Sequence, residues 1–319
     1  MMFTQILLLL VGLALIVFGA DWLVDGASSI ARRAGISEFV IGLTIVGFGT
    51  SCPELVVSLT GAIAGNADIS VGNVVGSNIF NTLLILGLTA AIMPVIVTES
   101  NRRRDIPITA VVTALLVALW YFTREISRIA GIAFLLLFIV YIIYSFKKDS
   151  GAETTESSAK SGFKDKLLSS IAGAIMFVAA GLAGLIFGGD LFVDAATNIA
   201  KMLGVSDKFI AITVLAAGTS LPELATSVTA AIKGRGQMAL GNILGSNVFN
   251  ILLILGLSAV ITPLSMAQIS LVDMMALLST AVLMLVFLLT GDSRKIDRWE
   301  GVVMLLFFAA YYVYLFSTL

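Results

Sequence analysis

Two glutamates occupy matching positions inside long apolar segments of this chain. Glu54 ends the stretch GFGTSCPE, and Glu223 ends the related stretch AAGTSLPE. A charge at the centre of a bilayer costs at least ~2.5–3.5 kcal/mol, so buried acids of this kind usually mark an ion site or pathway. A structural ion pair is the alternative, but no lysine or arginine lies at the centre of any apolar segment. The two carboxylates therefore predict cation or proton chemistry.

Pro53 and Pro222 directly precede the two glutamates. A proline inside a helix removes one N–H donor and clashes with the carbonyl four residues earlier. We therefore expect both helices to break here and to free backbone carbonyls. Such a break survives in hydrocarbon only where it is buried in protein or lines a polar cavity. Broken helices at matching positions of two halves indicate a transporter's substrate site.

A second motif, GNVVGSNIFN at 72–81, returns as GNILGSNVFN at 241–250. Ser77 and Asn81 are four residues apart and share one helix face, as do Asn73 and Ser77. In the copy, Ser246 and Asn250 take the places of Ser77 and Asn81. Carboxylate, hydroxyl, amide and carbonyl oxygens together favour hard cations such as Ca²⁺ and Na⁺.

Other residues of the two motifs have simpler interpretations. The glycines are expected to allow close packing of membrane helices, and they are Gly72, Gly76, Gly241 and Gly245. Four aspartates near helix ends are interpreted as solvated or capping carboxylates, with an ion entrance as the alternative; they are Asp21, Asp25, Asp190 and Asp194. Cys52 is replaced by Leu221 in the copy, so it is assigned no role.

The composition indicates a multi-pass membrane protein: 59% of the 319 residues are hydrophobic, 12% are charged, and the mean hydropathy is +1.05. A single cysteine and no histidine exclude an intrachain disulfide and a cysteine- or histidine-rich metal site. No basic tract suggests nucleic acid, and no obligatory protein partner is evident. Ten apolar spans are predicted at 3–28, 38–64, 70–97, 106–122, 129–146, 167–199, 207–232, 239–264, 269–290 and 300–317.

The chain divides into two repeats, 1–146 and 166–319, joined by a polar linker at 147–165. At an offset of 169 residues, 44–88 matches 213–257 at 25 of 45 positions. Because each half holds five helices, the second half must enter the membrane from the opposite side, so the repeats are inverted.

Loop charge predicts the orientation of the chain in the membrane. Loops on the side of the linker hold 15 Lys and Arg residues, and the opposite side holds 4. The positive-inside rule then places the linker 147–165 in the cytoplasm and both termini outside a cell membrane, the inner membrane in a bacterium.

The paired motifs resemble the two alpha-repeats of the sodium/calcium exchanger family, within the cation/calcium antiporters, and the short linker is similar to that of prokaryotic members. The resemblance implies a transporter, not an enzyme, whose all-α fold has ten transmembrane helices in two inverted five-helix repeats. It implies that a central ion cluster is lined by Thr50, Ser51, Glu54, Ser77, Asn81, Thr219, Ser220, Glu223, Ser246 and Asn250. It also implies that the carbonyls of Gly47 and Ala216 serve sodium.

One position departs from the family pattern. Members of the family often carry an aspartate where this chain has Asn250, whereas here both halves carry asparagine. We expect a secondary antiporter in the lipid bilayer that exports Ca²⁺ in exchange for Na⁺ by alternating access and uses no cofactor. A cation/proton antiporter on the same scaffold and, last, a cation channel remain the alternatives.

Overall fold

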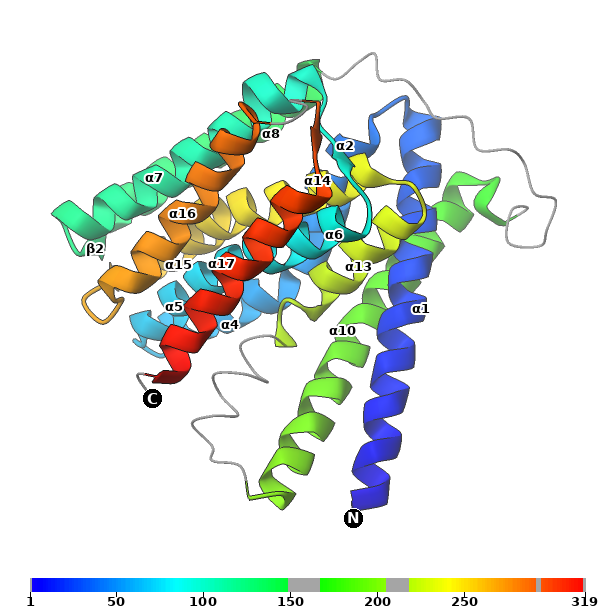
Figure 1. The fold of residues 1–319 in the computed structure, drawn as a ribbon, viewed down its shortest axis with the longest axis horizontal. Helices are drawn as coiled ribbons and strands as arrows, with labels where there is room; N and C mark the ends of the chain where they lie inside the picture. Colours follow the sequence, from blue (N-terminus) through cyan, green and yellow to red (C-terminus); the bar gives the residue numbers. More distant parts are fainter. Residues whose placement is uncertain (1, 149–166, 205–217, 291–293, 318–319) are drawn as a thin grey trace.

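The computed structural model describes residues 2–148, 167–204, 218–290 and 294–317, and within these ranges the protein is almost entirely helical (Figure 1). Seven helices are long and apolar enough to cross a membrane, one further pair is bent, and two apolar helices are shorter. These ten segments of the described chain follow the ten predicted spans. The two shorter ones are Leu221–Ile232 and Leu271–Phe287.

The first half runs through α1 (Met2–Ala34), α2 (Glu38–Ile41), η1 (Gly42–Val46), α3 (Gly47–Thr50), α4 (Cys52–Ile63), α5 (Ala67–Ile79), η2 (Phe80–Leu86), α6 (Gly87–Ile92), β1 (Val95–Ile96), η3 (Asn101–Asp105), α7 (Ile106–Phe122), β2 (Glu125–Ile126) and α8 (Arg128–Lys148). The second half contains α10 (Ile171–Met202), α13 (Leu221–Ile232), α14 (Gly236–Val248), η5 (Phe249–Ile254), α15 (Leu255–Ile261), β3 (Leu264–Ser265), α16 (Leu271–Phe287), β4 (Lys295–Ile296) and α17 (Arg298–Ser317). The segments named η are π-helical turns.

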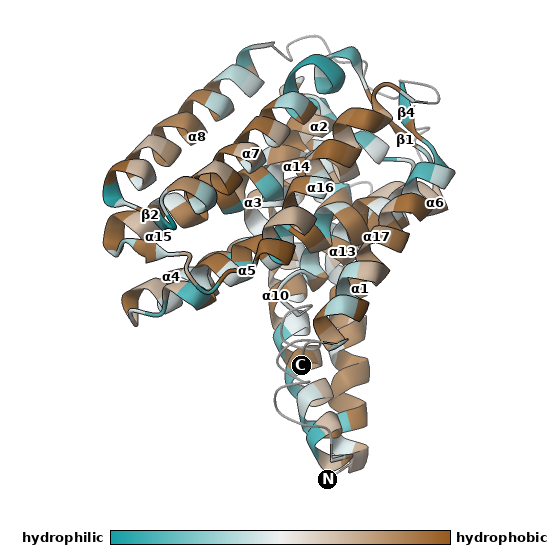
Figure 2. Cartoon of the chain, turned by 60° about the vertical axis from the view of Figure 1, so that its left-hand side comes forward, coloured by the Kyte–Doolittle hydropathy of each residue, from teal (hydrophilic) through white to brown (hydrophobic). Residues whose placement is uncertain are grey.

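Helices α1 and α10 lie side by side and extend together beyond the rest of the molecule (Figures 1 and 2). Their backbones approach closely at glycines. A Cβ added to Gly19 would lie 2.8 Å from the carbonyl oxygen of Gly181, and one added to Gly181 would lie 2.6 Å from the amide nitrogen of Leu23. Small residues allow membrane helices to make this close backbone contact. Few large side chains interlock between α1 and α10 at these glycines.

The segments that carry the polar motifs form the centre of the molecule. In the spans Ala67–Ile92 and Gly236–Ile261, 72% and 83% of the most apolar window is buried, against 17% in α17. Exposed apolar residues lie on α7, α8 and α17, for example Val111, Leu136 and Leu306, and these helices are coloured largely as hydrophobic in Figure 2, as expected where helices meet lipid. The prediction that glycines pack is confirmed at Gly241, where a Cβ would collide with the carbonyl of Phe39 in α2, and at Gly245 against Leu43. It is wrong at Gly72 and Gly76, where an added Cβ would meet no atom within 4 Å among the described residues.

The sequence did not predict four short strands. Spans three and eight were expected to stay helical to residues 97 and 264, but α6 ends at Ile92 and α15 at Ile261. The chain beyond each helix pairs antiparallel with a segment of the other half: β1 with β4 and β2 with β3. Two-residue strands have no period that a sequence pattern could reveal.

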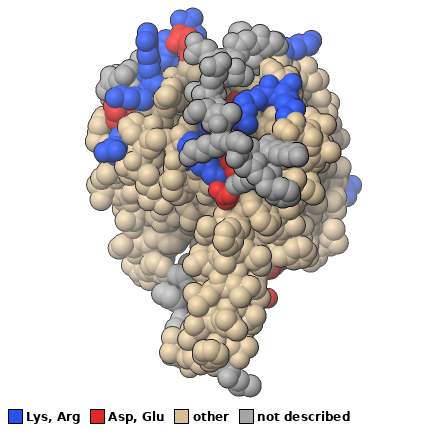
Figure 3. Space-filling model, turned by 90° about the vertical axis from the view of Figure 1, so that its right-hand side faces the viewer, with Lys and Arg blue, Asp and Glu red and all other residues tan. Residues whose placement is uncertain are grey.

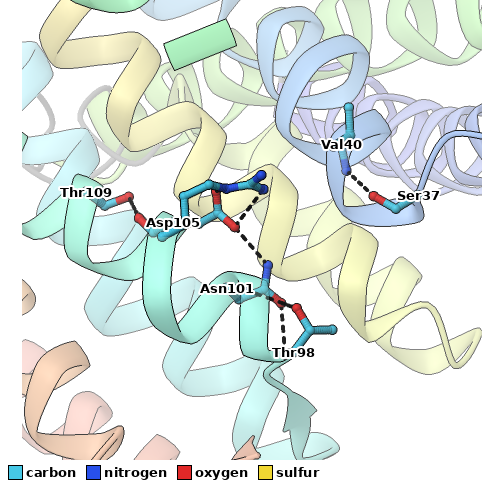
Figure 4. Close-up of polar contacts among 7 residues, drawn as sticks. Ser37, Val40, Thr98, Asn101, Asp105 and Thr109 are labelled. Carbon is cyan, nitrogen blue, oxygen red and sulfur yellow. Dashed lines mark hydrogen bonds and ion pairs between the residues drawn. The ribbon is translucent and has the colours of Figure 1, made fainter. Parts of the chain in front are cut away.

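Basic residues mark one end of the molecule. Lys and Arg gather there, at the end opposite the N-terminus of α1 (Figure 3). At this end the turn η3 is held by a polar chain in which Asn101 donates to Asp105 at 3.2 Å and Arg104 donates to Asp105 at 2.8 Å (Figure 4). Nearby, hydrogen bonds from Arg102 and Arg103 lower the pKa of Glu99 to about 2.

Candidate ion-binding site

The predicted break in the second span is present at Ser51. Helix α3 ends at Thr50 and α4 begins at Cys52, with a bend of 50° between the two helical parts. Pro53 occupies the second position of α4, where the missing N–H leaves no helical hydrogen bond unmade. Ser220 and Pro222 open α13 in the same way. The part of span seven before Gly218, including Ala216, lies outside the described residues.

The carbonyl of Gly47 is not freed by the break in this structure. It accepts the backbone N–H of Ser51 at 3.1 Å and lies 3.5 Å from the hydroxyl of Thr50. The proline removes the donor that would face Gly49, whereas Gly47 is two residues earlier and keeps its helical partner. A carbonyl oxygen has two lone pairs, so a role toward sodium would use the second one.

Each glutamate lies in the first turn of its helix and accepts a hydrogen bond from the opposite repeat. Ser51 donates to Oε1 of Glu223 at 2.8 Å, and Ser220 donates to Oε1 of Glu54 at 3.1 Å. The spacing S-x-x-E is that of a capping box, in which serine and glutamate would satisfy their own helix end. Here neither serine caps its own helix. The hydroxyls instead join the two repeats, and the positive ends of two helix dipoles face the carboxylates.

Six buried oxygen atoms among the predicted site residues have no hydrogen-bond partner in the described part of the protein. They are Oε2 of Glu54, Oε2 of Glu223, Oδ1 of Asn81, Oδ1 of Asn250, the hydroxyl of Thr219 and the hydroxyl of Ser246. Thr219 lies beside Glu54 and Ser246 beside Glu223, but neither hydroxyl reaches the geometry of a full hydrogen bond. Buried polar atoms are normally paired, so this group of acceptors fits a cation.

No basic side chain forms an ion pair with Glu54 or Glu223 within the described ranges, and both residues are fully buried. Ser77 also donates to Glu54 at 3.4 Å. Asn81 and Asn250 lie in the π-helical turns η2 and η5. Such turns often occur at functional sites because they rotate side chains out of the regular helical register.

Asn73 does not join the row of oxygens that its spacing suggested. Its amide donates to the carbonyl of Glu54 at 3.1 Å and to Ser58 at 2.9 Å, so it holds α4 against α5. Asn242 makes the related bond to Ser227 at 2.9 Å and accepts from Thr50 at 3.2 Å. Sequence reasoning missed these supporting bonds, although the identical residues in both repeats were a usable signal.

A cavity of about 660 Å³ reaches the site from the end of the molecule away from the basic residues. Its described lining includes Pro53, Ile69, Asn73, Asp190, Asp194 and Thr219. The aspartates on α10 are exposed and line this cavity, as the alternative interpretation of an ion entrance expected. The surface of the other repeat that corresponds to this cavity is buried. Ile69 in the cavity is 47% exposed, whereas its counterpart Met238 is 0% exposed.

Asp21 and Asp25 behave differently: they stay partly exposed, as solvated carboxylates would, but both pair with a lysine that the sequence did not predict. Lys233, at the end of α13, contacts Asp21 at 2.5 Å and Asp25 at 2.7 Å. The first repeat has Ala64 at the position of Lys233. The C-terminal half of α1 is thus tied to α13 by an ion pair, and Asp190 and Asp194 have no equivalent pair within the described ranges.

The model of the sodium/calcium exchanger protein family matches the chain twice, over residues 4–147 and 164–317. The chain belongs to the sodium/calcium exchanger family. It is 36% identical to the sodium/calcium exchanger MaX1 of Methanosarcina acetivorans, with 99% of both chains covered. It is 40% identical to the putative antiporter CaxA of Alkalimonas amylolytica, with 99% of this chain and 100% of that protein covered.

Solved structures agree with this assignment. The sodium-calcium exchanger NCX_Mj soaked with 10 mM Na⁺ and zero Ca²⁺ matches with a TM-score of 0.84, 34% identity and 99% of both chains covered. The inner membrane protein YrbG of Escherichia coli is 39% identical over 80% of this chain and 79% of its own length. The protein is therefore a multi-pass membrane antiporter of the sodium/calcium exchanger type, with the all-helical fold of NCX_Mj, and not an enzyme.

Proposed function

We propose that this antiporter exports Ca²⁺ in exchange for Na⁺, and that both ions bind between Glu54 and Glu223. The six unpartnered buried oxygens carry this proposal. Ca²⁺ takes six to eight oxygen ligands at ~2.3–2.6 Å. Two carboxylates with hydroxyl and amide oxygens, in a chain that has no histidine and a single cysteine, fit Ca²⁺ and Na⁺ better than a transition metal.

Access from one side at a time follows from the cavity. Ions reach the site through the cavity lined by Asp190 and Asp194, while the related surface around Met238 is closed. An inverted repeat exchanges the two arrangements when α1 and α10 move against the core. Under the orientation given by loop charge, the described conformation faces outward, with the cytoplasmic side shut.

Proton coupling is the second candidate, and the asparagine pair favours it. With Asn81 and Asn250 neutral, Glu54 and Glu223 are the acids among the proposed site residues, and either carboxylate can carry a proton in place of Na⁺. The name of the relative CaxA, a putative antiporter, specifies no ion.

Uptake of radioactive Ca²⁺ into everted vesicles or proteoliposomes separates the candidates. An outward Na⁺ gradient should drive uptake at constant pH, and an imposed pH gradient without Na⁺ should not. Uptake driven only by the pH gradient would replace Na⁺ with H⁺ as the counter-ion. Glu54→Gln and Glu223→Gln should each abolish uptake, because each removes one of the two buried charges. Glu125→Gln, at the exposed position of strand β2, is the matched control and should transport normally.

A further inference from the structure

Four buried asparagines near the two-fold axis break the symmetry of the repeats. Asn250 donates to Oδ1 of Asn78 at 3.0 Å. The repeat-related bond would run from Asn81 to Asn247, and it is not made: both Nδ2 and Oδ1 of Asn81 lack a partner. The sequence is identical at these positions in both halves, so the difference must arise from a neighbour.

Thr82 is that neighbour. The amide of Asn247 donates to the hydroxyl of Thr82 at 2.7 Å, and this leaves Oδ1 of Asn247 without a partner. In the second repeat Ile251 occupies the position of Thr82 and offers no acceptor. The side chain of Asn78 is therefore not drawn away from Asn250. It donates to the carbonyl of Asn247 at 3.2 Å and accepts from Asn250. Thr82 and Ile251 are both buried, so the contrast between them lies inside the protein.

We propose that Thr82 is a positioning residue that makes the two halves of the ion site unequal, by drawing Asn247 away from Asn81. Asn250 is then anchored with its free Oδ1 presented as a fixed cation ligand. Asn81 has no such anchor, so its carboxamide must be fixed in one orientation each time a cation binds. This inference rests on the proposed function, because it assigns the two amide oxygens to cations.

The energetic consequence falls mainly on Na⁺. Ca²⁺ draws most of its binding free energy from the two carboxylates, whereas Na⁺ ions beside them depend more on neutral oxygens. Immobilising a side chain on binding weakens the affinity, and a ligand held beforehand in its bound orientation avoids that cost. Asn81 therefore provides the weaker monovalent position and Asn250 the stronger one.

Thr82→Val tests this directly, because valine keeps the shape and removes the acceptor. Asn247 should then turn its amide to the carbonyl of Asn78 and offer Oδ1 to Asn81, as Asn78 does for Asn250. With Asn81 anchored, the concentration of Na⁺ that gives half-maximal stabilisation of the purified protein should fall about 2- to 10-fold. The corresponding Ca²⁺ concentration should change less than 2-fold. Thr82→Ser keeps the hydroxyl and should behave as the wild type.

A double-mutant cycle shows whether the effect passes through Asn247. In an Asn247→Ala background, Thr82→Val should no longer change the Na⁺ dependence, since the residue that links Thr82 to Asn81 is absent. Equal changes in Na⁺ and Ca²⁺ dependence, no change in either, or a full effect in the Asn247→Ala background would overturn the proposal. A wild-type protein that Na⁺ does not stabilise at all would instead refute the proposed function, so the two failures are distinguishable.

Discussion

Ser51 in the first repeat donates to Glu223 in the second at 2.8 Å, and the serine belongs to the same turn as the other glutamate, Glu54. Ser220 and Glu54 repeat the relationship in the opposite sense. The two broken helices are therefore coupled through their site residues. A movement of either helix displaces the carboxylate that the other repeat contributes.

Ser51→Ala and Ser220→Ala should weaken Ca²⁺ binding to a similar extent. A hydrogen bond to a charged group contributes about 1.5–3 kcal/mol, so each variant should lose roughly 10-fold or more in affinity. The measurement is Ca²⁺-dependent thermal stabilisation of the purified variants. Ser279→Ala is the control, because the hydroxyl of Ser279 donates to the carbonyl of Ala276 in its own helix, away from the two glutamates. Loss in one variant and none in the other would contradict the reciprocal coupling.

Pro53→Ala and Pro222→Ala should lower transport while the protein still folds. Each change returns an N–H to the second position of a helix, which favours a continuous helix through the bend and turns the adjacent glutamate. The check is uptake of radioactive Ca²⁺ together with the melting temperature. Wild-type exchange in both variants would show that the breaks do not shape the site.

Much of the ion site could be predicted from the sequence, because the acids, prolines and matching motifs predict two broken helices and a shared polar centre. The partners of those residues could not be predicted. Which repeat's serine reaches Glu223 depends on how the inverted halves dock, and no pattern within one helix encodes that. The π-helical turns at Asn81 and Asn250 and the ion pair of Lys233 likewise depend on tertiary packing, because helical periodicity reports only which face is apolar.

Lys233→Ala should shift the protein toward the inward-facing state. The ion pair with Asp21 and Asp25 is partly exposed, and such pairs contribute about 0.2–1 kcal/mol, which corresponds to a shift of roughly 1.5- to 5-fold. In a Cys52→Ala background, Met238→Cys should then react faster with a thiol reagent added to the cytoplasmic side. Lys295→Ala, which removes a pair with Asp297 in the loop beside β4, is the control and should leave the rate unchanged. An unchanged rate in the Lys233→Ala variant would mean that the pair does not hold this side closed.

Single cysteines at Ser157 and Ser317 should be labelled from opposite sides of the membrane. Loop charge places the linker in the cytoplasm and the C-terminus outside, so Ser157→Cys should react only from the cytoplasm and Ser317→Cys only from outside. Both variants carry Cys52→Ala, which removes the one native thiol. Labelling of both from the same side would overturn the inverted arrangement.

The charge of the site predicts the stoichiometry of exchange. Glu54 and Glu223 give a formal charge of −2, and Asn81 and Asn250 add none. One Ca²⁺ neutralises this charge, and so do two Na⁺ ions, whereas a third Na⁺ would leave a net positive charge in a medium of low dielectric constant, where unpaired charge is costly. Exchange should therefore be close to electroneutral, with two monovalent ions for each Ca²⁺.

Proteoliposomes clamped at several potentials with K⁺ and valinomycin test this stoichiometry. A steep dependence of the equilibrium Ca²⁺ gradient on voltage would refute it. Asn250→Asp introduces the acid that related exchangers often carry, and it should make exchange voltage-dependent or strengthen Ca²⁺ binding. Asn242→Asp is the matched substitution, because Asn242 is also a buried asparagine but bonds Ser227 and Thr50. It adds a charge beside the site rather than in it.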